Sequence, residues 1–153
     1  MQVPASGPPQ GQQLVGRDLL TMGQVQGLEK VSALYGYVPT FHDARILRLQ
    51  IHVKDRKIVA WMKYTDLKGS SSSEHITTWI KMSLLDVKVC DLNLDNWSLY
   101  DFQVDVTDAG VIINLDDPSS WSVSSLNAEK VEFELIDEGE TAGWHHRLNI
   151  CWE

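Results

Sequence analysis

The residue types best suited to catalysis stand together in the segment GYVPTFHDA, residues 36–44, where His42 is followed directly by Asp43. A histidine and a carboxylate aimed at one substrate atom can serve as general base and acid, or can hold a metal ion. Neighbouring residues of an extended segment point to opposite sides, however, so these two side chains are not expected to converge. We interpret the segment as a rigid structural corner. Pro39 stops the preceding helix, Phe41 plugs the bend, and Asp43 accepts backbone hydrogen bonds while His42 points outward.

The other histidines show no spacing typical of a metal site. His145 and His146 are neighbours in a predicted strand and face opposite sides, and His52 and His75 belong to different segments. The chain also contains no GxSxG, P-loop, HExxH or glycine-rich dinucleotide turn. These observations predict that the protein is not an enzyme and that it has no catalytic residues, no metal and no cofactor.

The absence of a recognisable targeting signal and the placement of the cysteines favour a cytoplasmic protein. No apolar run approaches the roughly 20 residues needed to cross a bilayer, and the start MQVPASGPPQGQQ lacks the features of a signal peptide. Cys90 and Cys151 are far apart in apolar-alternating segments, which predicts two buried thiols in a reducing compartment. Residues 1–22 are expected to be a disordered segment or an artificial addition, and residues 23–153 to form one domain.

Hydrophobic periodicity predicts one short helix and then a series of strands. Apolar residues recur every three or four positions from Gln24 to Tyr35, and Gly36 follows where a helix commonly ends. Alternation of apolar and polar residues predicts strands at 45–54, 57–65, 76–89, 99–106, 111–115, 129–136 and 144–152. The apolar phase changes within the third strand, so a bulge or break is expected near Leu84 and Leu85. The predicted fold class is α+β, a mainly antiparallel β-sheet or sandwich of seven to eight strands with one short N-terminal helix.

The charge of the chain, −8 in total, is distributed unevenly. Residues 1–83 hold ten Lys and Arg against six Asp and Glu, whereas residues 84–153 hold three against fifteen. An acidic field disfavours phosphate backbones and favours cationic partners, so no nucleic acid is expected as a partner. Alternation places a set of carboxylates on the outward side of two strands, and we predict that they form one acidic binding face for a basic protein: Asp101, Asp105, Glu132 and Glu134.

The run G-x-x-P-T-F-H-D-A followed by the alternating Arg45-Ile46-Leu47-Arg48-Leu49 resembles the opening of the immunity protein 50 family of bacterial polymorphic toxin systems. This resemblance implies an α+β protein that is encoded beside a toxin and neutralises it by binding. Arg45 departs from the polar residue common after the alanine in that family. No catalytic role is implied for the motif.

The resemblance and the charge pattern lead to one hypothesis and two alternatives. The hypothesis is an immunity protein that binds and blocks a cognate toxin domain, with no membrane partner. The first alternative is a small enzyme or ligand-binding domain that uses His42, Asp43 and a cleft lined by tryptophan. The second is a structural assembly subunit that pairs through an exposed strand edge. The six tryptophans are interpreted mainly as core packing.

Overall fold

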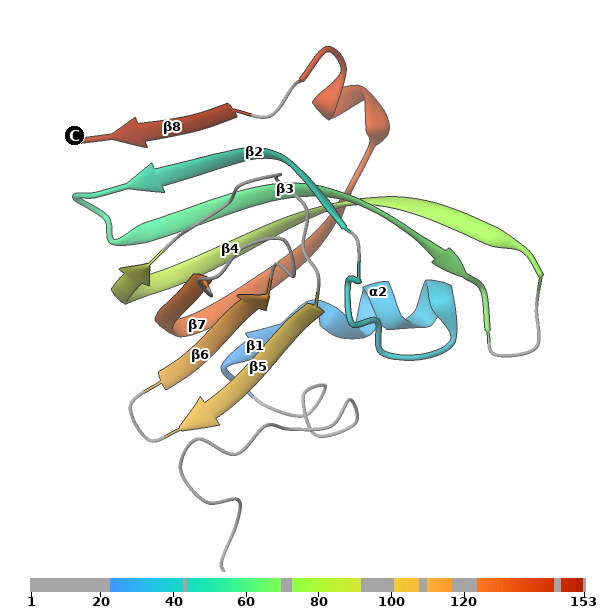
Figure 1. Ribbon diagram of the computed structural model, residues 1–153, viewed down its shortest axis with the longest axis horizontal. Helices are drawn as coiled ribbons and strands as arrows, with labels where there is room; N and C mark the ends of the chain where they lie inside the picture. Colours follow the sequence, from blue (N-terminus) through green and yellow to red (C-terminus); the bar gives the residue numbers. More distant parts are fainter. Residues whose placement is uncertain are drawn as a thin grey trace, which may run out of the picture.

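The computed structural model describes residues 23–42, 44–69, 73–91, 101–107, 110–116, 124–144 and 147–152 of the chain. These residues form a broad twisted sheet with one α-helix beside it (Figure 1). In chain order the elements are β1 (Val25–Gln26), α2 (Leu28–Tyr35), β2 (Arg45–His52), β3 (Lys57–Leu67), β4 (His75–Asp91), β5 (Asp101–Thr107), β6 (Gly110–Asp116), β7 (Ser124–Ile136), the 3-10 helix η1 (Glu138–Thr141) and β8 (Arg147–Cys151).

The strands form one open sheet in the order β5-β6-β7-β4-β3-β2-β8, and β1 adds to β7 outside this path. The pairs along the path from β5 to β2 are antiparallel, whereas β8 runs parallel to β2 and β1 runs parallel to β7. The predicted α+β class holds in its coarse form, because the described chain is mostly sheet with one α-helix. The sheet is mixed rather than simply antiparallel, because both ends of the described chain join it as parallel strands.

Several predicted elements are confirmed with shifted bounds. The neighbouring strands pair as two hairpins, β2 with β3 and β5 with β6. The strand predicted at 129–136 begins earlier, at Ser124, and the last strand spans only Arg147–Cys151. No helix among the described residues is long and apolar enough to cross a membrane.

The helix begins four residues later than the periodicity predicts because Gly27 interrupts it. Gly27 has a φ of 83°, a left-handed conformation that glycine adopts without steric cost. Val25 and Gln26, predicted as helical, instead pair with Val131 and Glu132 of β7. The predicted end is confirmed, since Gly36 has a φ of 84° and its N–H donates to the Ser32 carbonyl at 2.8 Å.

The core lies between α2 and the face of the sheet that the helix covers. The helix contributes Leu28, Val31 and Tyr35, all at most 2% exposed. Even-numbered residues of the central strands meet them, which is the alternation expected of a half-buried strand. The buried residues of β3 and β4 on this face are Ile58, Ala60, Met62, Tyr64, Ile80, Met82 and Leu84.

Two irregularities change which residues reach the core. The register of β2 against β3 shifts between Ile46 and Arg48, so Leu47 is only partly buried, whereas Leu49 reaches the core. In β4 the predicted break is found slightly later than expected. Asp86 has a φ of 54°, and the register against β7 shifts between Val87 and Val89.

Candidate functional site

The corner between α2 and β2 is organised around Phe41. Phe41 is fully buried and has a φ of 57°. Its ring stands edge-on to Tyr64, with centroids 5.2 Å apart, and stacks on Phe133 at 5.6 Å. The plug therefore joins the corner to β3 and β7, which explains why an aromatic residue is needed at this bend.

The proline and the histidine of the corner differ in their exposure to solvent. Pro39 is buried, whereas His42 is exposed. The amide of Ala44 donates to the carbonyl of Phe41 at 3.0 Å and closes the turn around them. The hydrogen-bonding role predicted for Asp43 lies outside the described residues and stays a prediction.

Possible metal ligands are not gathered in the described part of the chain. No group of three or more His, Cys, Asp or Glu side chains lies close enough there to hold an ion. His52 contacts the Gln50 side chain at 3.2 Å, and His145 and His146 lie outside the described residues. The prediction of two buried thiols is wrong, because Cys90 is exposed and Cys151 is partly exposed.

The register separates the four carboxylates of the predicted acidic face. Asp101 and Asp105 lie on β5, the edge strand, with β6 between them and β7. Glu132 and Glu134 pair with Ser83 and Lys81 of β4 instead. Asp105 pairs with Ile112 of β6, and Ile112 pairs with Asn127 of β7. Asn127 is five residues from Glu132, a distance of roughly 17 Å along the strand. The four residues share a sheet but occupy two separate regions of it.

Aromatic and cationic side chains gather on the face of the sheet opposite α2. In β3 and β4 the odd-numbered residues occupy this face, since the even-numbered ones fill the core. Cross-strand register pairs Arg48 with Trp61, Trp61 with Lys81, and Lys63 with Trp79. Trp144, just after η1, joins this set because its ring stands at 88° to that of Trp61 with centroids 5.3 Å apart. We call this group the Trp–cation face: Arg48, Trp61, Lys63, Trp79, Lys81 and Trp144.

Each tryptophan of this face is matched with a cation. The Arg48 guanidinium carbon lies 3.8 Å from the centre of the Trp144 ring. Lys81 Nζ lies 5.7 Å from the Trp61 ring, and Lys63 Nζ lies 5.8 Å from the Trp79 ring. Cations at these distances are attracted by the negative face of the indole. The tryptophans are all only partly buried, so their rings remain accessible to a partner.

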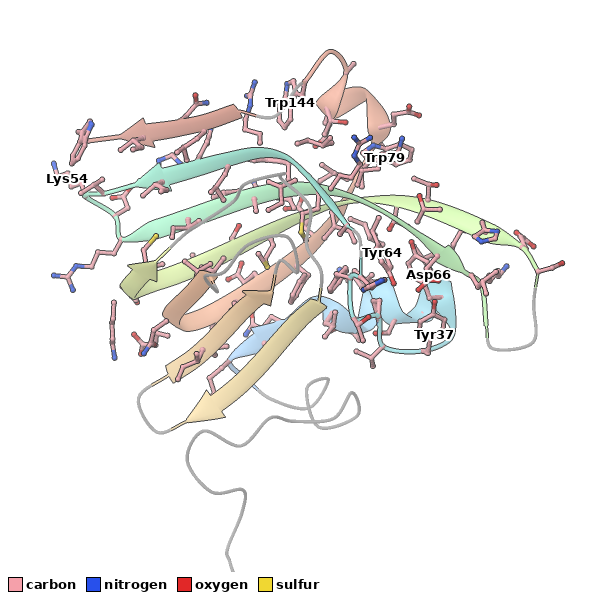
Figure 2. All side chains as sticks on the ribbon, in the orientation of Figure 1. Tyr37, Lys54, Tyr64, Asp66, Trp79 and Trp144 are labelled. Carbon is pink, nitrogen blue, oxygen red and sulfur yellow. The ribbon has the colours of Figure 1, made fainter. Side chains whose placement is uncertain are left out.

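A cleft of about 460 Å³ opens beside this face, where the η1 segment approaches the strands. Trp79 and Trp144 flank it, and both lie beside η1 in the upper part of the view (Figure 2). Leu47, displaced by the irregularity in β2, supplies apolar surface, and Lys63 and Glu138 supply opposite charges. The first alternative combined a cleft lined by tryptophan with His42, but His42 is not among the residues that line this one.

Arg48 carries an unsatisfied donor. Its Nε is buried and has no hydrogen-bond partner among the residues that the structure describes. A buried donor left unpaired costs about 1–3 kcal/mol, so the stacking of Arg48 on Trp144 comes at some cost to the free protein. Arginine is also better suited than lysine to this position, since its planar group stacks on the indole of Trp144 while still offering donors.

A second cluster of polar groups lies beside α2, where Tyr37, Tyr64 and Asp66 approach one another (Figure 2). Tyr64 donates to the Asp66 carboxylate at 2.6 Å, and the Leu67 amide donates to the same carboxylate at 2.7 Å. Tyr37 donates to the Leu67 carbonyl at 2.8 Å. Burial and the nearby carboxylate raise the pKa of Tyr37 to about 12, and burial likewise raises the pKa of Tyr64. Both tyrosines therefore stay protonated donors at neutral pH.

The Asp66 carboxylate is expected to stabilise the folded protein to an extent that depends on pH. Burial alone would raise the pKa of Asp66, but hydrogen bonds from Tyr64 and the Leu67 amide outweigh it and hold the pKa below its usual value. A depressed pKa in the folded state stabilises the protein above the unfolded pKa of about 3.9, and this stabilisation is lost as the pH falls through the folded value. Asp66→Asn is expected to cost about 1 kcal/mol at pH 7.

The measurement is urea unfolding of the wild type and of Asp66→Asn at pH 7 and near pH 3. The difference in unfolding free energy should shrink toward acid, because below about pH 3.9 the carboxylate of the unfolded chain binds a proton before that of the folded protein does. A difference that stays constant across this range would contradict the assignment. Asp86→Asn is the matched control, because Asp86 is exposed on β4 and should change little at either pH.

The tryptophans are the site residues that the sequence interpretation missed. They were assigned mainly to the core, yet no tryptophan belongs to the buried core of the described residues, and Trp152 is 72% exposed. Trp97 and Trp121 lie outside the described residues. A signal was present, because Trp61 and Lys63, and Trp79 and Lys81, each stand two residues apart on the polar phase of their strands.

No family model, curated protein or solved structure matches this chain.

Proposed function

We propose that the protein is a toxin-neutralising immunity protein, which acts in the cytoplasm by binding a cognate bacterial toxin domain and catalyses no reaction itself. The resemblance of residues 36–49 to the immunity protein 50 family supports this proposal. In such a protein the GxxPTFHDA motif serves the fold and the binding surface lies elsewhere. The fully buried position of Phe41 is in keeping with a structural role for the motif.

The Trp–cation face is the observation that carries the proposal. Tryptophan and arginine are enriched among the few residues that supply most of the binding energy in protein interfaces. Here three partly buried indoles gather on one side of the sheet, and the Arg48 guanidinium stacks on one of them. Because strands hold these side chains in place, little conformational entropy is lost when a partner covers them.

This surface changes the expected charge of the partner. Arg48, Lys63 and Lys81 favour carboxylates on the toxin, whereas the acidic residues Asp101, Asp105, Glu132 and Glu134 would favour a basic toxin. We propose the Trp–cation face as the contact because its residues form one continuous surface, while the acidic residues lie in two regions of the sheet.

The test is calorimetric titration of the protein with the toxin domain encoded beside its gene. The double substitution Trp61→Ala with Trp79→Ala is expected to weaken binding by about 10- to 100-fold, because it removes two central aromatic anchors. Co-expression of this variant with the toxin should also fail to restore bacterial growth. Trp152→Ala is the matched control, because that indole is highly exposed at the far end of β8 and should not alter the affinity.

A second variant compares the two surfaces directly. Neutralising the four acidic residues together, as Asp101→Asn, Asp105→Asn, Glu132→Gln and Glu134→Gln, should leave the affinity close to that of the wild type. If this variant loses binding and the double tryptophan variant keeps it, the contact lies on the acidic residues and the toxin is basic. If the wild-type protein neither binds nor neutralises the neighbouring toxin, the proposed function is wrong.

A further inference from the structure

β8 leaves one edge of the sheet open at an unusually apolar strand. Among the described residues it pairs with β2 alone, and it ends the order of strands (Figure 1). Leu148 and Ile150 are 47% and 46% exposed, and Trp152, which follows the strand, is 72% exposed. These three are the majority of the large hydrophobic residues that the described chain exposes, and they stand at alternate positions. Alternate residues of a strand share a face, so they form one apolar stripe.

The stripe continues the apolar face of the sheet. Leu148 is in register with Leu49, which is 4% exposed in the core, and Ile150 is in register with Ile51, which packs against the core. Residues in register on parallel strands lie on the same face. The core face of the sheet therefore runs on past β2 and is left half-exposed at its last strand.

The backbone of β8 is also available for pairing. The Cys151 carbonyl accepts a hydrogen bond from the Val53 amide at 2.9 Å and so points toward β2. Peptide groups of successive residues in a strand point to opposite sides, so those of Leu148 and Ile150 point toward the open edge. An unpaired row of donors and acceptors beside apolar side chains is a template for another strand.

The two edges of the sheet differ in their protection. Proteins commonly protect an edge strand with charges, prolines or bulges. The sequence of β5, DFQVDVT, carries two aspartates, whereas β8, RLNIC, carries one charge, at its first residue Arg147, and residues 148–152 carry no charge and no proline. β8 thus has the composition of a strand that is covered in the working protein.

We infer that a second copy of this chain pairs antiparallel with β8 about a twofold axis at Ile150. In this register Ile150 lies opposite Ile150 of the second copy, and Leu148 lies opposite Trp152. The N–H and C=O groups of Leu148, Ile150 and Trp152 all point toward the open edge, so these residues can form the hydrogen-bonded pairs of an antiparallel ladder. The pattern is self-complementary, as a twofold interface requires, and no like charges meet between residues 148 and 152.

The size of the contact limits its strength. A ladder of five residues with three apolar side chains on each copy is at the low end of specific interfaces, which begin near 1,200 Å² of total buried surface. We therefore expect a dimer with a dissociation constant on the order of micromolar rather than nanomolar. The pairing leaves the Trp–cation face uncovered, since that face lies opposite the apolar stripe, so this inference does not depend on the proposed function.

The experiment is sedimentation equilibrium of the full chain over a concentration series from about 1 to 300 μM. The wild type should shift from one to two chain masses across this series, and hydrogen exchange at the amides of Leu148 and Ile150 should slow as the concentration rises. Ile150→Lys places two ammonium groups opposite each other at the axis and should raise the dissociation constant at least about tenfold.

Leu34→Lys is the matched control. Leu34 is 42% exposed, close to the value for Ile150, but lies on α2. This variant should dimerise like the wild type. A wild type that remains one chain mass at 300 μM overturns the inference, as does an Ile150→Lys variant that dimerises as strongly as the wild type. If Ile150→Lys does not fold, Trp152→Lys replaces it, since this residue lies beyond the strand and should again raise the dissociation constant.

Discussion

Gly27→Ala is expected to destabilise the protein by at least about 3 kcal/mol. A Cβ atom at this position would lie only 1.9 Å from the carbonyl oxygen of Phe133, a backbone atom of β7 that cannot move aside without breaking its ladder. The φ of 83° adds a cost of about 1–2 kcal/mol for any residue with a Cβ. Thermal unfolding should show a decrease of about 10 °C in the midpoint for a chain of this size.

A matched control separates the two causes of this loss. Gly143 has a similar φ of 76°, but nothing lies within 4 Å of a Cβ built there. Gly143→Ala should therefore cost only about 1 kcal/mol, the cost of the left-handed backbone. Equal losses of unfolding free energy for the two variants would show that the close approach of Gly27 to β7 does not contribute to the cost. The steric explanation for Gly27 would then be wrong.

Phe41→Ala is expected to cost about 3–5 kcal/mol, the usual range for a phenylalanine removed from a packed core. Its ring is fully buried between Tyr64 of β3 and Phe133 of β7, so truncation leaves a cavity where three segments meet. Chemical denaturation should show a lower midpoint with an unchanged slope, because the surface exposed on unfolding is nearly the same.

His42→Ala is the companion variant, and it tests the structural interpretation of the GxxPTFHDA segment. His42 is exposed, so its truncation should change the unfolding free energy much less than that of Phe41. Binding to the partner should also persist in this variant. A His42→Ala protein that keeps its stability but loses all function would instead favour a catalytic or ligand-binding role for this residue.

Periodicity predicted most of the elements, because each strand alternates apolar and polar residues and Gly36 ends the helix. It failed where a longer-range contact decided the outcome. Val25 fits the helical pattern, but pairing with β7 and the conformation of Gly27 place it in a strand. Parallel addition of β8 to β2 could not be predicted, since nothing local in either strand specifies a neighbour about a hundred residues away.

The candidate site was harder to predict than the fold for a related reason. The acidic residues were grouped by their outward phase, but phase does not determine which strands are neighbours, and β6 separates β5 from β7. Trp144 joins Trp61 only because η1 leads the chain back to the outer face. The tryptophans of β3 and β4 stand at the polar positions of their strands, and this was the signal for a surface site. They were interpreted as core residues because large aromatic side chains are usually buried.

The two parallel pairs have a consequence for how the chain folds. Val25 meets Val131, and Leu49 meets Leu148, so both ends of the described chain are joined to strands far along it. Contacts of such high sequence separation raise the contact order and slow folding, because the entropy of closing a long loop is lost before the contact forms. During synthesis the β2–β3–β4 meander can assemble early, while its outer edge on β2 waits for β8. The nascent chain therefore exposes an unpaired edge at β2 until nearly the last described residues are made, and this interval is when it is most prone to aggregate.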